Sequence, residues 1–89
     1  MEEHDLDRIL RDILTRLGVE VRVEPMEFGS GGFCRLDDEP LIVLSPGLPL
    51  SKRIEFYLEA LRRLDTSGIY LPPAIRDRLE EGGSDPDIS

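Results

Sequence analysis

Residues 29–40 read GSGGFCRLDDEP and combine a glycine cluster, the single cysteine of the chain and a run of three acids. Two structures compete for this stretch: a glycine-rich loop that cradles a phosphate, or two turns on either side of a short strand. A GxxxxGK[ST] loop needs a lysine, and a GxGxxG loop needs a third glycine followed by a helix. The stretch meets neither requirement, whereas adjacent glycines supply the positive φ angles of hairpin turns. We therefore predict a turn, a strand and a second turn.

Helices are expected on both sides of this region. Leucine and isoleucine recur at helical spacing over residues 5–17, with Asp5 as a candidate N-cap and Gly18 as a candidate C-cap. A second apolar stripe predicts a helix over residues 50–64. A Pro-Pro pair then opens a short third helix that is expected to end at Leu79.

Three segments between the first two helices have strand patterns. Residues 19–23 alternate valine with charged residues, which is typical of a half-buried strand. Residues 33–36 form a short strand, and residues 41–44 are apolar on both faces, as in a strand covered on both sides. Because short turns join antiparallel neighbours, we predict an α+β fold of order α-β-β-β-α-α. In this fold a three-stranded antiparallel meander carries the helices on one face.

The charges are concentrated at the two ends of the chain. The 89 residues have a net charge of −8, yet residues 8–79 contain as many basic as acidic side chains. We expect residues 1–79 to form one domain and residues 80–89 a flexible acidic tail. A basic face for nucleic acid is not apparent, and no apolar run approaches the roughly 20 residues of a membrane span. The chain is thus expected to be soluble and cytoplasmic, with no nucleic-acid or membrane partner.

Candidate catalytic and metal-binding side chains are few. Activation of the Cys34 thiol needs a nearby base or positive charge, but the only histidine is His4, outside the first helical stripe. Arg35 points to the opposite face of the same strand, so Cys34 is predicted to be a buried structural thiol. Residues 37–39 are interpreted as a solvated turn. No catalytic residue, cofactor or metal is expected.

Residues 31–64, GGFCRLDDEPLIVLSPGLPLSKRIEFYLEALRRL, resemble a set of small uncharacterised bacterial proteins in which a Gly-Gly-x-Cys strand and an apolar strand precede a helix. The order of elements is also similar to the opening of zincin-type metalloproteases, whose helix carries H-E-x-x-H. The corresponding residues here are Leu58-Glu59-Ala60-Leu61-Arg62. The glutamate is kept, but Leu58 and Arg62 stand in place of the zinc-binding histidines. This resemblance implies a metal-free relative of the scaffold and not a protease.

Alternation along the strands predicts which side chains share a face of the sheet. The face towards the helices is expected to carry Val19, Val21, Val23, Cys34, Leu36, Leu41 and Val43. The outer face is expected to carry the apolar residues Met26, Phe28, Phe33, Ile42 and Leu44, beside Arg22, Glu24 and Arg35. A face that mixes large apolar groups with charges is typical of an interface. Either a second subunit or the chain's own IYLPP segment, residues 69–73, is expected to cover it.

The sequence therefore predicts a small, non-catalytic interaction or structural module, homodimeric through this outer face or bound to another protein. Two alternatives stay open. One is a degenerate, metal-free zincin-like binding domain. The other is an enzyme that uses Cys34 or Glu59 in a pocket formed between subunits, which an acid of strongly shifted pKa beside Cys34 would favour.

Overall fold

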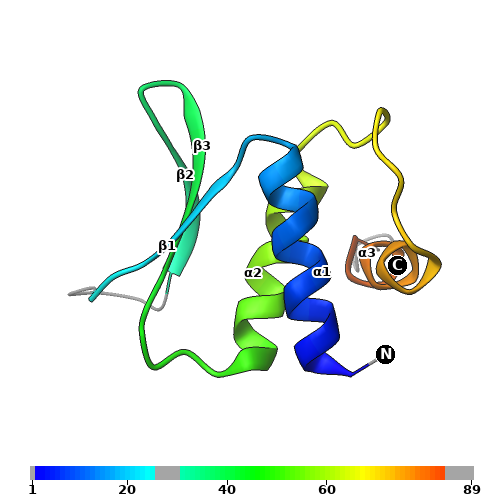
Figure 1. Cartoon of the computed structure of the whole chain (residues 1–89), viewed down its shortest axis with the longest axis horizontal. Helices are drawn as coiled ribbons and strands as arrows, with labels where there is room; N and C mark the ends of the chain where they lie inside the picture. Colours follow the sequence, from blue (N-terminus) through cyan, green and yellow to red (C-terminus); the bar gives the residue numbers. More distant parts are fainter. Residues whose placement is uncertain (1, 26–30, 84–89) are drawn as a thin grey trace, which may run out of the picture.

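Three helices and three strands follow one another in the predicted order (Figure 1). The structure, a computed structural model, describes residues 2–25 and 31–83. The elements are α1 (Glu3–Arg16), β1 (Glu20–Val23), β2 (Gly31–Leu36), β3 (Glu39–Leu44), α2 (Leu50–Arg62) and α3 (Pro73–Gly83). This arrangement confirms the α+β class and the order of the elements.

The sheet is mixed, so the predicted antiparallel meander is wrong. β3 lies in the centre, pairs antiparallel with β2 and pairs parallel with β1. β1 and β2 follow each other along the chain but lie on opposite sides of β3. The rule that short connections join paired neighbours fails for them, because the most apolar segment, residues 41–44, takes the central position instead.

The core shows that the predicted faces of β2 and β3 are exchanged, whereas Val19 and Val21 lie on the helix side as predicted. Ile42 and Leu44, expected on the outer face, have no exposed surface and belong to the core beneath the helices. Phe33 lies opposite Ile42 and packs against the same core. The reason is the register of β1, in which Val21 lies opposite Ile42, so that both share the helix face. A difference of one residue in pairing phase moves every side chain of a strand to the other face.

The outer face consequently carries residues that were expected inside. Cys34 lies opposite Leu41 in the β2–β3 pair and is exposed, so the prediction of a buried thiol is wrong. Leu41 is nonetheless buried on this face, and Val43 is half-buried. Val23 lies opposite Leu44 and so on the helix face, as predicted, but it ends the edge strand β1 and is 48% exposed.

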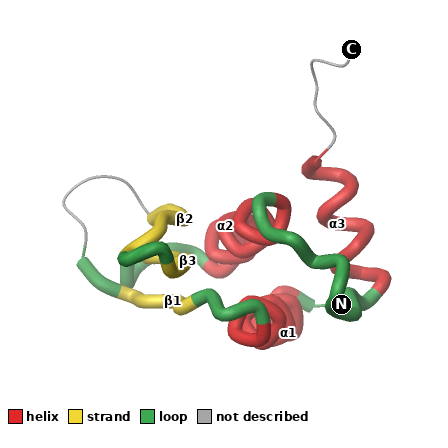
Figure 2. The backbone as a smooth tube through the Cα atoms, turned by 90° about the horizontal axis from the view of Figure 1, so that it is seen from above, coloured by secondary structure: helices red, strands yellow, loops and turns green. Residues whose placement is uncertain are grey.

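Two layers of helix lie on the same side of the sheet (Figure 2). α1 and α2 pack against each other and against the strands, whereas α3 packs on α2 away from the sheet. The core consists of Leu6, Leu10, Ile13, Leu14, Val19, Ile42, Leu44, Ile54, Tyr57, Leu58, Ala60, Leu61 and Ile75. The helices therefore lie on one side of the sheet, as expected, but only α1 and α2 cover the strands.

The ends of two helices differ from the expected ones. α1 begins at Glu3 with Glu2 as its N-cap residue, so Asp5 lies within its first turn. α3 continues past Leu79 to Gly83, which includes the first residues of the expected tail. In the described part of the chain, no helix is both long enough and apolar enough to cross a membrane.

Candidate functional site

A groove of about 760 Å³ lies between the edge strand β2 and the helix α2. Its lining residues are Gly32, Phe33, Leu48, Pro49, Lys52, Glu55, Phe56, Glu59 and Arg63. β2 supplies the first two, the β3–α2 connection supplies the next two, and one face of α2 supplies the rest. Phe33, Leu48 and Phe56 rest on the core with one side and remain partly exposed on the other. The groove thus has an apolar floor that the chain itself only half covers.

The charged side chains of the groove form two ion pairs along α2. Lys52 Nζ lies 3.7 Å from Glu55 Oε1, and Arg63 donates to Glu59 Oε2 at 3.0 Å. These pairs have the i,i+3 and i,i+4 spacings that place side chains side by side on a helix. Both are exposed, and each contributes at most about 1 kcal/mol to stability. Along the groove the charges follow one another as plus, minus, minus, plus.

Every second residue of β2 directs its backbone N–H and C=O groups away from β3, at the edge of the sheet beside the groove. The Leu44 carbonyl accepts a hydrogen bond from the Glu24 N–H at 3.0 Å, so this group of β3 points towards β1. Gly31, which lies opposite Leu44, therefore makes a non-hydrogen-bonded pair with β3. Because such pairs alternate with hydrogen-bonded ones, Phe33 and Arg35 also direct their N–H and C=O groups away from β3. In the described part of the chain, β2 has no strand on that side.

Gly32 lines the groove at a place where the fold does not require glycine. Its φ is outside the left-handed region, and a Cβ added there would meet no atom within 4 Å. Glycine inside a strand weakens it, and it often marks a close approach by another backbone or a ligand. Gly32 belongs to the strand whose outer edge has no neighbouring strand within residues 2–25 and 31–83.

The structure separates the residues that the sequence singled out. Phe33 and Glu59 line the groove, while Ile42 and Leu44 are buried in the core. Cys34 is on the outer face of the sheet, so it does not share a site with Glu59. The other two predicted interface residues, Met26 and Phe28, lie outside the described residues.

The helix positions that correspond to a zincin motif have other roles here. Leu58 is buried in the core, and Arg62 donates from Nε to the Leu79 carbonyl and from Nη2 to the Arg78 carbonyl, both at 3.2 Å. Only Glu59 faces the groove. Over residues 2–25 and 31–83, no three His, Cys, Asp or Glu side chains come together as metal ligands.

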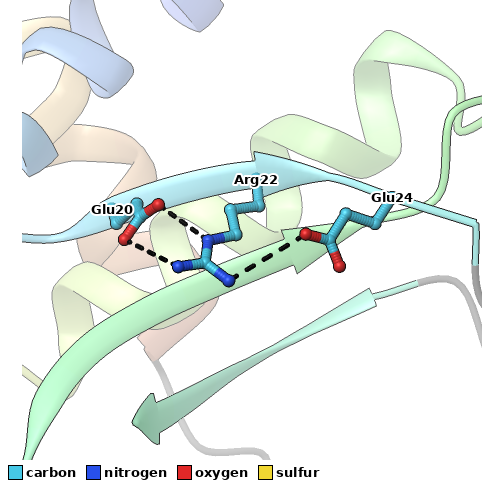
Figure 3. A network of polar contacts seen from close by, with 3 residues as sticks. All are labelled: Glu20, Arg22 and Glu24. Carbon is cyan, nitrogen blue, oxygen red and sulfur yellow. Dashed lines mark hydrogen bonds and ion pairs between the residues drawn. The ribbon is translucent and has the colours of Figure 1, made fainter. Parts of the chain in front are cut away.

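The outer face of β1 carries a row of three charges (Figure 3). Arg22 lies between Glu20 and Glu24, with its Nε 2.7 Å from Glu20 Oε2 and its Nη1 3.9 Å from Glu24 Oε2. The hydrogen bond from Arg22 lowers the pKa of Glu20, and the same bond raises the pKa of Arg22. The three side chains satisfy one another on a solvated surface, so we assign them no binding role.

A second polar group lies between α1 and α2. The Tyr57 side chain is completely buried, and desolvation raises its pKa to about 12, with the charge of Asp7 as the next cause. Asp7 is close enough for this effect, but neither the Tyr57 hydroxyl nor Asp7 Oδ1 reaches a hydrogen-bond geometry. Arg53 Nε is buried nearby without a partner as well. These groups belong to the helix interface and do not open into the groove.

Comparison of the chain with known protein families, with curated proteins and with solved structures finds no match. The groove is therefore identified as the candidate site from its geometry alone. Sequence reasoning missed most of it, although two signals were present. Phe56 is an aromatic residue outside the buried stripe of its helix, and Gly32 interrupts a strand.

Proposed function

We propose that this protein is a non-catalytic interaction module that binds an apolar segment of another protein in the groove between β2 and α2. One observation carries the proposal: a half-covered apolar floor adjoins a strand edge whose backbone groups have no strand opposite them among the described residues. The floor attracts apolar side chains, and the edge selects a partner that has a polypeptide backbone.

The size and chemistry of the groove support a peptide ligand. Ligand pockets commonly enclose about 300–1,000 Å³ and combine an apolar lining with a few polar groups. Phe33, Leu48 and Phe56 form such a lining here. Each apolar side chain that a partner buries completely contributes about 1.5–3 kcal/mol, before the cost of association. Two or three such side chains contribute about 3–9 kcal/mol, which is comparable to an association cost of about 4–15 kcal/mol, so the complex also needs the hydrogen bonds that the β2 edge offers.

Charge argues for a partner other than a second copy of the chain. A two-fold axis at the centre of the groove would reverse one α2 against the other, so that Lys52 would meet Arg63 and Glu55 would meet Glu59. The net charge of −8 on each copy adds repulsion. The acidic residues at the two ends of the chain attract a segment flanked by Lys or Arg instead. The homodimer expected from the sequence stays a prediction, without Ile42 and Leu44 as its contact residues.

Display selection tests this function directly. Random short peptides with basic flanks are selected on the wild-type protein, and the recovered peptides are synthesised and measured by fluorescence anisotropy. Phe56→Ser removes one of the three apolar side chains of the floor, and Tyr70→Ser is the matched control, because Tyr70 is 75% exposed and outside the groove. We expect Phe56→Ser to weaken binding by at least about tenfold and Tyr70→Ser to leave it unchanged. Circular dichroism checks that both variants are folded.

Two results would contradict the proposal. Selection that recovers no peptide would show that the groove does not bind extended or helical segments. Peptides that bind Phe56→Ser as tightly as the wild type would place their site elsewhere on the molecule.

A further inference from the structure

We infer that the partner binds as a fourth strand of the sheet, along the free edge of β2, and that Gly32 leaves room for its approach. This inference rests on the proposed function and specifies the conformation and sequence pattern of the partner. Three features of the structure carry it: the phase of the hydrogen bonds, the bare position at Gly32 and the alternation of side chains at the edge.

The hydrogen bonds of β2 supply the first feature. The N–H and C=O groups of Phe33 and Arg35 point away from β3 and have no strand opposite them in the described part of the chain. Such an edge is a template for another extended backbone. A helical ligand would satisfy its own backbone groups and leave these four unused. The edge therefore favours a partner segment in the extended conformation.

Gly32 supplies the second feature. Because Phe33 faces the helices, a Cβ at Gly32 would lie on the outer face with Cys34, and no atom of the described residues is within 4 Å of its position. In the isolated chain, a β-branched residue would suit this strand position better than glycine. In the complex, a partner strand would pass alongside this position, and its neighbouring side chain would cover the bare backbone. Strand addition would account for glycine at this position, since glycine in a strand often marks the close approach of another backbone.

The third feature predicts the partner's sequence pattern. Side chains of an added strand alternate between the two faces of the sheet. Those next to Phe33 would enter the groove and contact Phe56, while the intervening ones would lie on the outer face beside Cys34. The bound segment therefore has apolar residues at every second position and no proline where it donates to β2. Basic flanks are expected because the excess of acidic residues lies at the two ends of the chain, while residues 8–79 have no net charge.

Amide exchange tests the hydrogen bonds. The tightest peptide recovered by display is added to the labelled wild-type protein, and exchange is followed residue by residue by NMR. We expect exchange at the Phe33 and Arg35 amides to slow by at least about tenfold on binding. The Gly32 and Cys34 amides already point towards β3 and serve as internal controls whose exchange changes little.

Substitution and backbone methylation test the approach. Gly32→Val is expected to keep the fold and weaken binding by at least about tenfold. Gly68→Val is the matched control, because a Cβ at Gly68 also meets no atom within 4 Å and Gly68 is outside the groove. N-methylation along the peptide is expected to abolish binding at every second residue only, since alternate N–H groups face β2.

The outcomes separate this inference from the proposed function. Binding that is lost in Phe56→Ser but is insensitive to Gly32→Val, with no two-residue pattern of N-methyl effects, would overturn strand addition and leave the groove as the site. Absence of any binding would overturn both. A wild-type dimer in light scattering that Gly32→Val dissociates would identify a second copy as the occupant and would overturn the assignment to a different protein.

Discussion

The phenol of Tyr57 on α2 lies buried beside the carboxylate of Asp7 on α1, and the Tyr57 hydroxyl and Asp7 Oδ1 have no hydrogen-bond partner among the described residues. Burial alone disfavours the ionised phenolate, and the negative charge of Asp7 disfavours it further. Together they raise the pKa of Tyr57 from its usual 10.0 to about 12. Ionisation of Tyr57 at alkaline pH is therefore expected to weaken the packing of α1 on α2.

Alkaline unfolding is the first prediction. In the unfolded chain Tyr57 ionises near pH 10, whereas in the folded chain it stays neutral up to about pH 12. Its contribution is fully present below the unfolded pKa and is lost as the pH rises from about 10 to about 12, by at most about 2–3 kcal/mol. Urea unfolding at several pH values should show this loss in the wild type and in the exposed control Tyr70→Phe. Tyr57→Phe should lose distinctly less; an equal loss would mean that another group is responsible.

The register of β1 and β3 leads to the second prediction. Val21 lies opposite Ile42 on the helix face, and Ile42 is completely buried. Ile42→Ala should lower the free energy of unfolding by about 2–5 kcal/mol, because it removes a buried side chain and leaves a cavity. Val23→Ala should cost less than about 1 kcal/mol, since Val23 is 48% exposed. If Ile42 lay on the outer face, as expected from the sequence, its substitution would cost no more than that of Val23.

This register also shows where local sequence reasoning stops. The helical stripes of residues 5–17 and 50–64 identified α1 and α2 because a helix repeats its contacts within a few residues. The strands were found by alternation as well, but alternation does not specify which strands pair. The assumption that β1 pairs with β2 fixed the wrong phase, and it placed Ile42 and Cys34 on exchanged faces.

The candidate site depends on the same non-local information. Phe33 was expected at an interface and does line the groove, although on the helix side of the sheet. Phe56 becomes its neighbour only because α2 folds back over β2. No pattern in the sequence around either residue indicates that the two are neighbours in the fold. Glu59 was noticed for its match to a metal-binding motif, but its actual partner is Arg63.

The turn between β2 and β3 leads to the third prediction. Asp37 and Asp38 have φ angles of 55° and 67°, so both central residues of the two-residue hairpin are left-handed. This geometry is the type I′ turn, in which glycine is preferred at the second position. Asp38→Gly should relieve about 1 kcal/mol of backbone strain and, after its entropic cost, raise stability by roughly 0.5 kcal/mol. Urea unfolding measures the change.

A control of opposite sign accompanies this substitution. Asp38→Val places a β-branched residue at the same positive φ and should destabilise the protein by more than about 1 kcal/mol. Equal effects of the two substitutions would show that the Asp38 side chain, and not its backbone conformation, determines the stability of the turn.

The docking of α3 leads to the last prediction. The Arg62 guanidinium donates to the carbonyls of Arg78 and Leu79 in the second half of α3. A cation near the C-terminal carbonyls also opposes the negative end of the helix dipole. Arg62→Met keeps most of the aliphatic length and removes both hydrogen bonds, so it should cost about 1–2 kcal/mol. Arg63→Met removes only the exposed pair with Glu59 and should cost less than about 1 kcal/mol. In hydrogen exchange, Arg62→Met should speed exchange in α3 before it affects α1. Uniform acceleration in all elements would instead show that α3 unfolds together with the rest of the domain.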